Sequence, residues 1–382
     1  MGRERGVSRD LKTAQRWVIK IGSSLLTNNG QGLDLAAIEA WVTQILVLRR
    51  SGIEIVLVSS GAVAAGMERL GWQTRPTALH QLQAAASVGQ AALIQTYEDF
   101  LRRGGVHGSQ VLLTHEDLRD RQRYLNARAT LRILLEMGVV PIINENDAIA
   151  SAEIRFGDND TLAAMVANLL EADLLVILTD QAGLYNRDPR HDPDAHLLTE
   201  VQAGDPELLR MAGGAGTALG SGGMITKVRA ASRAAQSGAA TLIAPGSTEN
   251  VLLRLWAGEE IGTYFRPGVA KLAARKRWLA GQLRPTGTLH LDAGAARVLR
   301  ERGSSLLPVG ITAAEGDFQR GDLLCCVDPE GQEVARGLVN FARQEVLLRL
   351  GKSSKALNTL FGDVDEIEII HRDNLVLSSD SS

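Results

Sequence analysis

The chain has 382 residues, of which 45% are hydrophobic and 22% are charged, and 41 Lys and Arg stand against 44 Asp and Glu. This length suggests two or three domains, each able to bury a core. The formal net charge of −3 argues against whole-surface nucleic-acid binding and against a polybasic membrane protein. The first twelve residues lack the apolar stretch of a signal peptide, and no apolar run is long enough to span a bilayer. We therefore expect a soluble, cytoplasmic protein.

Short apolar, β-branched runs alternate with longer helical patterns over about the first 260 residues. The predicted strands are 17–21, 53–59, 110–113, 139–143, 174–179 and 241–244. The predicted helices are 35–50, 62–70, 78–103, 123–137, 161–171 and 225–237. Several strands are almost continuously apolar, which is typical of parallel strands covered on both faces. The pattern predicts an α/β fold, a three-layer sandwich with a mostly parallel sheet, in which ligands bind beyond the carboxyl ends of the strands.

The pattern changes after about residue 265. Residues 274–287 are basic and contain Gly and Pro, as expected of a linker between domains. Beyond them lie short strand-like pieces, a predicted helix at 293–302 and a predicted hairpin turn at 328–331. We expect a large domain at 14–265, a linker at 266–284, a small β-rich domain at 285–362 and a tail at 363–382.

The first segment with unusual chemistry is Lys20 to Ser24, at the end of the first predicted strand. A lysine inside an apolar strand is costly unless its ammonium group is paired, and the Gly-Ser-Ser turn that follows offers backbone N–H groups to a phosphate. The alternative interpretation is a lysine on an edge strand whose ammonium group reaches the solvent.

A second segment, Val58 to Ala62, leads from a predicted strand through small residues into a helix. Small residues let a ligand approach the backbone, and a helix N-terminus favours an anion. A tight turn between strand and helix, with no ligand, explains the same residues.

A third pair of segments, 144–150 and 156–160, collects carboxylate and amide side chains in one loop system. Its polar members are Asn144, Asn146, Asp147, Asp158, Asn159 and Asp160. Such groups suit an ammonium-bearing substrate, a magnesium ion or the orientation of lysines. Asp160 also directly precedes a predicted helix, so that the sequence equally suggests an N-cap there.

A fourth segment, LGSGGMITK at 219–227, enters a predicted helix. It is not a P-loop, because Lys227 lies inside the start of the helix and is followed by Val228. A glycine-rich turn at a helix N-terminus with a lysine nearby is nevertheless suited to a phosphate. The alternative is a flexible glycine-rich linker.

Several other chemistries are excluded by missing motifs. The seven histidines show no spacing typical of a zinc hydrolase, no G-x-S-x-G is present, and no G-x-G-x-x-G follows the first strand. The two cysteines, Cys325 and Cys326, are adjacent, which gives neither a disulfide framework nor zinc-ligand spacing and favours a reducing compartment. Whether either thiol has a redox role stays open.

Taken together, these segments resemble the amino acid kinase family, and within it the members that phosphorylate glutamate. The resemblance rests on stretches that occur in order over nearly the whole chain, namely VIKIGSSLL, IVLVSSGAVAAG, AAASVGQ, LNARATL, VPIINENDAIASAEIRFGDNDTLAA, LLVILTDQAGLYNRDPR, LGSGGMITK and RKRW. The stretches ERGSSLLPVGI and GDLLCCVDPEGQEVARGLVNF resemble the PUA domain that follows the kinase domain in many bacterial members.

The resemblance implies transfer of the γ-phosphoryl group of ATP to the side-chain carboxylate of L-glutamate, giving L-glutamyl 5-phosphate in the first step of proline biosynthesis. It implies that Lys20 and Lys227 are catalytic cations and that Asp160 orients them. The residues implied in glutamate binding are Ser60, Asp147, Asn159, Asp158 and Asn144. Those implied in ATP binding are Lys20, Thr179, Asp180, Ser221, Gly222, Gly223, Met224, Ile225, Thr226 and Lys227. Mg²⁺ is expected to bridge the ATP phosphates, with no metal ligand expected from the protein.

The resemblance further implies feedback inhibition by L-proline and a homo-oligomer, either a dimer or a tetramer. Two positions depart from the family pattern: Ser221 stands where threonine is more frequent, and Ile225 stands where a small polar residue is common. Two alternatives stay open. One is an RNA-associated protein, because PUA-like folds elsewhere bind RNA and residues 275–362 carry a net charge of +4. The other is a related amino acid kinase with a different carboxylate substrate.

Overall fold

The computed structural model describes residues 11–27, 32–149, 159–213, 223–268, 285–361 and 367–378. These residues fall into two compact units, a large one formed mainly by the chain before residue 269 and a small one formed mainly by the chain after residue 284.

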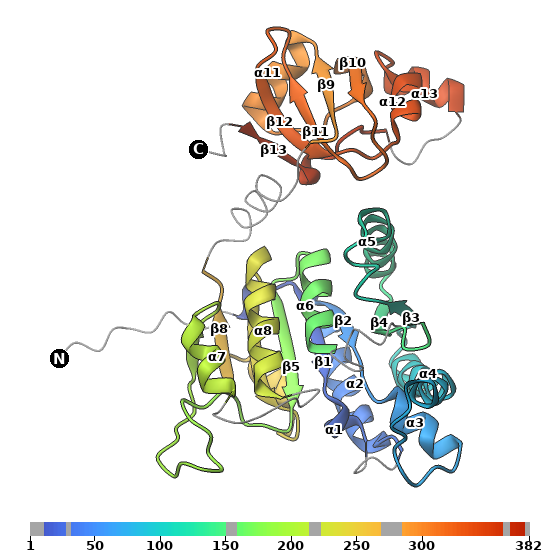
Figure 1. Ribbon diagram of the computed structural model, residues 1–382. Helices are drawn as coiled ribbons and strands as arrows, with labels where there is room; N and C mark the ends of the chain where they lie inside the picture. The colour runs from blue at the N-terminus through green and yellow to red at the C-terminus, as the bar shows by residue number, and fades with distance from the viewer. Residues whose placement is uncertain are drawn as a thin grey trace, which may run out of the picture. The chain divides into compact units, whose positions relative to one another are not determined.

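Eight described strands form one sheet in the large unit, in the order β3-β4-β2-β1-β5-β7-β8-β6 (Figure 1). Their bounds are β1 Arg16–Ile21, β2 Glu54–Val58, β3 Gly108–Leu113, β4 Val140–Glu145, β5 Leu174–Thr179, β6 Glu200–Gln202, β7 Ala240–Pro245 and β8 Thr263–Arg266. Neighbouring strands are parallel except for β7 and β8, which are antiparallel. The predicted α/β fold with a mostly parallel sheet is confirmed, whereas the two short strands β6 and β8 were not predicted.

Helices cover both faces of this sheet (Figure 1). They are α1 Ser23–Leu26, α2 Leu35–Arg50, α3 Ala62–Arg69, α4 Leu79–Arg103, α5 Arg121–Glu136, α6 Asn159–Leu169, α7 Pro206–Gly213, α8 Met224–Ala234 and α9 Val251–Trp256. Helices α6 and α8 pack against the central strands on one face, and α2 packs with α4 and α9 on the other. The large unit therefore has the predicted three layers.

The alternation of side chains along β1 explains why a lysine belongs in this strand. Trp17, Ile19 and Ile21 are fully buried in the core that α2 and α9 cover. Because successive residues of a strand point to opposite faces, Lys20 points to the face of α6. Its side chain is 7% exposed and is paired there with the carboxylate of Asp160 on α6. The alternative interpretation, a lysine on an edge strand whose ammonium group reaches the solvent, is therefore wrong.

Helices α3 and α4 approach each other through two glycines. A Cβ atom added to Gly66 would lie 1.7 Å from the carbonyl oxygen of Ala85, and one added to Gly89 would lie 1.9 Å from that of Ala62. The obstructing atoms belong to the backbone, so no side chain can move aside. The two helices thus touch backbone to backbone, and this contact begins directly after the turn that holds Ser60.

Replacing Gly66 with alanine is therefore expected to destabilise the protein by about 2 kcal/mol or more, because overpacking outweighs the better helix propensity of alanine. The midpoint of thermal unfolding should fall by roughly 5 °C. Gly213→Ala is the matched control, because its Cβ would meet only Ile225 Cδ1 at 3.8 Å. Equal midpoints for the two variants would contradict the close helix contact.

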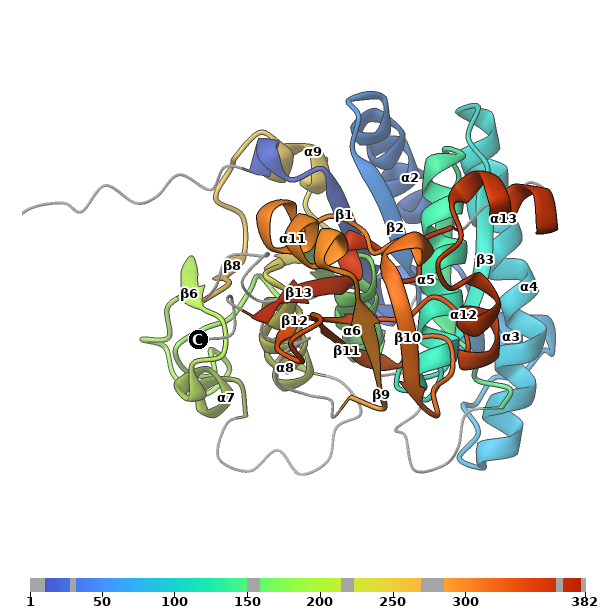
Figure 2. The same cartoon turned by 90° about the horizontal axis from the view of Figure 1, so that it is seen from above.

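The small unit is built on a five-stranded sheet in the order β10-β9-β11-β12-β13. Its strands are β9 Gly287–Leu291, β10 Ile311–Gly316, β11 Leu323–Val327, β12 Glu333–Leu338 and β13 Leu375–Leu377, and its helices are α11 Ala293–Arg302, α12 Arg343–Arg349 and α13 Ser354–Phe361. Helix α11 packs against β9 and β12, and α12 packs against β10 (Figure 2). The predicted helix at 293–302 and the hairpin turn at 328–331 are both confirmed.

The adjacent cysteines lie in β11. The pKa of Cys325 is raised to about 11, mainly by burial and to a smaller extent by the negative charge of Glu333. Burial raises the pKa of Cys326 still further. Both sulfurs are therefore thiols at neutral pH, and the thiol is the unreactive form. Across the described ranges, no helix is both long and apolar enough to cross a membrane.

Candidate active site

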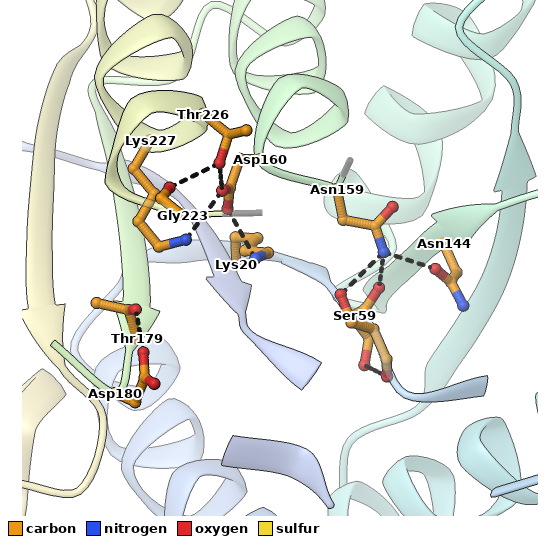
Figure 3. A network of polar contacts seen from close by, with 11 residues as sticks. Lys20, Ser59, Asn144, Asn159, Asp160, Thr179, Asp180, Gly223, Thr226 and Lys227 are labelled. Carbon is orange, nitrogen blue, oxygen red and sulfur yellow. Dashed lines mark hydrogen bonds and ion pairs between the residues drawn. The ribbon is translucent and has the colours of Figure 1, made fainter. Parts of the chain in front are cut away.

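Two lysines from different elements share one buried carboxylate at the carboxyl edge of the large sheet. Lys20 Nζ on β1 lies 2.7 Å from Asp160 Oδ1, and Lys227 Nζ on α8 lies 3.0 Å from Asp160 Oδ2 (Figure 3). All three side chains are at most 10% exposed. We call these three residues the charged triad.

The charge state of the triad follows from its surroundings. Burial alone would raise the pKa of Asp160, but the charges of Lys20 and Lys227 and the hydrogen bonds from Lys20 and Thr226 lower it to about 2. Thr226 Oγ1 lies 2.7 Å from Asp160 Oδ2 and 2.8 Å from the carbonyl oxygen of Gly223. One carboxylate therefore stands against two ammonium groups, and the excess positive charge suits an anion.

Asp160 does not cap a helix. Helix α6 begins at Asn159, so Asp160 lies within its first turn, and its carboxylate oxygens face Lys20, Lys227 and Thr226. The N-cap suggested by the sequence is therefore wrong. The reason is that two ammonium groups compete for a carboxylate far more strongly than a backbone N–H does.

A second cluster contains amide side chains and lies next to the triad, because Asn159 and Asp160 are consecutive (Figure 3). Asn159 Nδ2 donates to the carbonyl oxygen of Ser59 at 2.7 Å, to Ser60 Oγ at 3.0 Å and to Asn144 Oδ1 at 3.0 Å. These residues come from the ends of β2 and β4 and from the start of α6, and they are all buried. We call this group the amide cluster.

The start of α8 leaves backbone donors available for a ligand. Gly223 is the N-cap residue, with φ 148°, and no side chain caps the helix. Met224, Ile225 and Thr226 are the first three residues of the helix, and their backbone N–H groups have no partner within it. At the end of β5, Thr179 Oγ1 donates to Asp180 Oδ1 at 3.0 Å. A helix N-terminus beside two ammonium groups is a suitable place for phosphate groups.

Asp147 lies in the turn after β4 and is half-buried. Burial raises its pKa to about 6, although the positive charge of Arg75 acts in the opposite direction. An acidic side chain that titrates near neutral pH at the edge of a polar cluster is a candidate for a functional group.

Comparison with known proteins identifies the family. A profile of the amino acid kinase family matches residues 15–244, and a profile of the PUA domain matches residues 287–360. The glutamate 5-kinase of Chromohalobacter salexigens is 60% identical over 99% of this chain and 100% of its own length, and that of Ectopseudomonas mendocina is 59% identical over 95% and 98%. The chain belongs to the amino acid kinase family.

Within this family, the kinase is similar over nearly its whole length to several glutamate 5-kinases. The glutamate 5-kinase of Thioalkalivibrio sulfidiphilus, for example, is 59% identical over 96% of this chain and 98% of its own length. The small unit of the kinase contains a PUA domain, as the sequence predicted. These matches do not favour the alternative of an RNA-associated protein.

The structure of the kinase brings most of the predicted site residues to one edge of the sheet. Lys20, Asp160 and Lys227 form the charged triad, and Ser60, Asn144 and Asn159 belong to the amide cluster. Three predicted residues, Asp158, Ser221 and Gly222, lie outside the described residues. The roles assigned to all of these residues stay predictions.

Some polar neighbours of the kinase site were not predicted. Gln90 on α4 accepts a hydrogen bond from Asn144, and Tyr97 Oη lies 3.1 Å from Ser59 Oγ. Thr226 was predicted as part of the ATP-binding loop, but its contact with Asp160 was not foreseen. The only sequence signal for Gln90 was its place in the stretch AAASVGQ, which contributed to the family resemblance without suggesting a role.

Proposed function

We propose that the protein transfers the γ-phosphoryl group of ATP to the side-chain carboxylate of L-glutamate, forming L-glutamyl 5-phosphate for proline biosynthesis. The observation that carries this proposal is the charged triad, in which two buried ammonium groups are held by one carboxylate beside the amide cluster. The name of the full-length relatives, glutamate 5-kinase, supports the same substrate.

The chemistry requires charge stabilisation rather than proton transfer. The side-chain carboxylate of glutamate is ionised at pH 7, so it attacks phosphorus without a general base. Negative charge spreads over the oxygens of the transferring phosphoryl group in the transition state. In this proposal Lys20 and Lys227 bind those oxygens, and Asp160 holds both ammonium groups in place.

The residues at the start of α8 fit the phosphates of ATP. They offer unpaired backbone N–H groups and Lys227, and Thr179 and Asp180 at the end of β5 complete the proposed nucleotide site. Lys227 and the N–H groups are donors that suit phosphate oxygens. In the described part of the chain, no three His, Cys, Asp or Glu side chains are grouped as metal ligands. In this proposal Mg²⁺ is bound by the ATP phosphates, where it would supply additional positive charge.

The amide cluster and Asp147 form the proposed glutamate site. Ser60, Asn144 and Asn159 are held together by hydrogen bonds, and Asp147 offers a carboxylate to the ammonium group of the substrate. Asp158 is proposed as a second acidic neighbour of that ammonium group. A homo-oligomeric state and a cytoplasmic location belong to the same proposal.

A direct assay tests the reaction. Purified protein is incubated with ATP, Mg²⁺ and L-glutamate in the presence of hydroxylamine, which converts an acyl phosphate into a hydroxamate that is measured as its coloured iron(III) complex. ADP and hydroxamate should form in equal amounts with L-glutamate and should not form with L-aspartate or N-acetyl-L-glutamate. ADP formation with another carboxylate, and none with glutamate, would assign a different substrate to this kinase.

Asp147→Asn should raise the KM for glutamate by roughly 10-fold or more at pH 8 and leave kcat nearly unchanged, because it removes the charge that faces the ammonium group. In the unchanged protein, kcat/KM for glutamate should fall as the pH decreases through about 6, where Asp147 gains a proton. The variant should lack this inflection. Asp194→Asn, in an exposed loop, is the control. An identical pH profile in both variants would remove Asp147 from the substrate site.

L-Proline should inhibit competitively with glutamate. It carries an α-carboxylate beside a positively charged nitrogen, as glutamate does, and the proposed site recognises that nitrogen through Asp147. The apparent KM for glutamate should therefore rise with proline concentration at constant kcat, and N-acetyl-L-proline, which has no ammonium group, should be a much weaker inhibitor. Inhibition that saturating glutamate does not relieve would indicate a separate proline site.

A further inference from the structure

The amide cluster continues beyond the proposed substrate residues to a glutamine of helix α4. Gln90 is 8% exposed, and its Oε1 accepts a hydrogen bond from Asn144 Nδ2 at 2.7 Å. Asn144 Oδ1 in turn accepts from Asn159 Nδ2 and from the backbone N–H of Glu145. Gln90, Asn144 and Asn159 therefore form a chain of three amides, which we call the amide relay.

Backbone groups fix which way each amide of the relay points. The N–H of Glu145 can only donate, so it identifies the atom of Asn144 that it meets at 2.9 Å as the oxygen. The carbonyl of Ser59 can only accept, so it identifies the atom of Asn159 that it meets at 2.7 Å as the nitrogen. The atom of Asn144 that faces Gln90 is therefore Nδ2, a donor, and the atom of Gln90 that accepts from it is Oε1.

This fixed order leaves one group unpaired at each end of the relay. Asn159 Oδ1 and Gln90 Nε2 are buried, and neither has a hydrogen-bond partner among the residues that the structure describes. In Figure 3 the oxygen of Asn159 lies on the side away from Ser59 and Asn144. The relay thus presents Asn159 as an acceptor, and an ammonium group is the complementary donor.

The close contact of α3 and α4 places Gln90 at the relay. Its neighbour Gly89 lies against Ala62, which follows the Ser60 turn after only one residue. A larger residue at position 89 would push α4 away and draw Gln90 out of reach of Asn144. The glutamine is therefore held against the substrate cluster by the backbone of a neighbouring helix.

Stability alone does not account for this glutamine. Its Oε1 pairs with Asn144, but its buried Nε2 is left unpaired, and an unpaired buried donor costs as much as a typical hydrogen bond contributes. A role in substrate binding, exerted through the contact of Oε1 with Asn144, explains better why a glutamine is present at position 90.

We propose that Gln90 is a positioning residue for the amino-acid substrate. It acts through Asn144, whose nitrogen it holds, and so keeps Asn144 Oδ1 in place to accept from Asn159 Nδ2, which holds Asn159 at the position where its oxygen faces the substrate ammonium group. This inference rests on the proposed phosphorylation of glutamate, and it adds a residue outside the substrate-contacting set.

The test replaces Gln90 with leucine, which keeps the approximate size of the side chain and removes both amide atoms. The KM for glutamate should rise by about 10-fold, while kcat and the KM for ATP should stay within about twofold. The inhibition constant of glutarate, which lacks the ammonium group, should not change. Gln81→Leu, at an exposed position of the same helix, is the matched control. If the leucine variant does not fold, Gln90→Met serves in its place.

A double-variant cycle shows whether Gln90 acts through Asn144. In an Asn144→Ala background, Gln90→Leu should cause no further rise in the KM for glutamate, because the link between the two residues is already broken. An unchanged KM in the single variant, an equal loss of glutarate affinity, or a full 10-fold effect in the Asn144→Ala background would each overturn the inference. The unchanged protein serves as the reference: if it does not phosphorylate glutamate at all, the proposed function fails, whatever the variants do.

Discussion

Replacing either lysine of the charged triad with alanine is expected to lower kcat by at least about 100-fold, by analogy with the loss of one oxyanion donor. Lys20 and Lys227 are proposed to bind oxygens whose charge develops mainly in the transition state, so that the KM for glutamate should change only a few-fold. Steady-state kinetics with each substrate varied in turn measures both quantities.

The matched control for Lys227→Ala is Arg229→Ala, which removes an exposed cation from the same helix. This control should retain kcat within about twofold, because an exposed charge is screened by solvent. If Lys20→Ala or Lys227→Ala keeps a normal kcat with a raised KM, that lysine binds the ground state only, and its proposed catalytic role is wrong.

Asp160→Asn is expected to cause the largest combined loss of activity and stability. The substitution leaves two buried ammonium groups, Lys20 and Lys227, without a counter-charge, and breaking a buried ion pair from one side costs about 3–5 kcal/mol. We expect kcat to fall at least about 100-fold as well, because the lysines lose the group that holds them. Denaturant unfolding and steady-state kinetics measure the two effects separately.

The pH dependence of stability provides a further test of Asp160. The folded protein lowers the pKa of Asp160 from 3.8 to about 2, so its contribution is fully present above pH 4 and is lost as the pH falls toward 2. The asparagine variant should lack this component of acid unfolding. Glu39→Gln is the control, because it removes an exposed ion pair with Arg103 and should cost less than about 1 kcal/mol. Equal stability losses in the two variants would show that the triad is not a buried charge network.

The sequence predicted helix bounds best where a strong cap is present. The helices at 35–50 and 293–302 were predicted with the bounds that the structure shows, and in both an aspartate just before the first residue accepts a backbone hydrogen bond. For α6, where the cap suggested at Asp160 is wrong, and for α8, where no side chain caps the helix, the predicted bounds differ from the observed ones by one to three residues. Strands β6 and β8 were missed because they are only three and four residues long and have no apolar run.

The candidate site was predictable to the extent that it depends on strand ends. Lys20, Ser60, Asn144 and Thr179 all follow from the rule that the carboxyl ends of parallel strands share one edge of the sheet. The meeting of Lys227 with Asp160 required the resemblance to a family, because 66 residues separate them along the chain. Gln90 lies in the middle of a long helix, and its contact with Asn144 depends on the path of α4, which no local pattern specifies.

The glycine contact between α3 and α4 has a consequence for the geometry of the proposed substrate site. Since backbone meets backbone at Gly66 and Gly89, the two helices cannot slide or part by small steps without losing contact entirely. Ser60, just before α3, and Gln90, on α4, are therefore held at a fixed spacing, so that the proposed substrate site cannot widen by a movement of one helix away from the other.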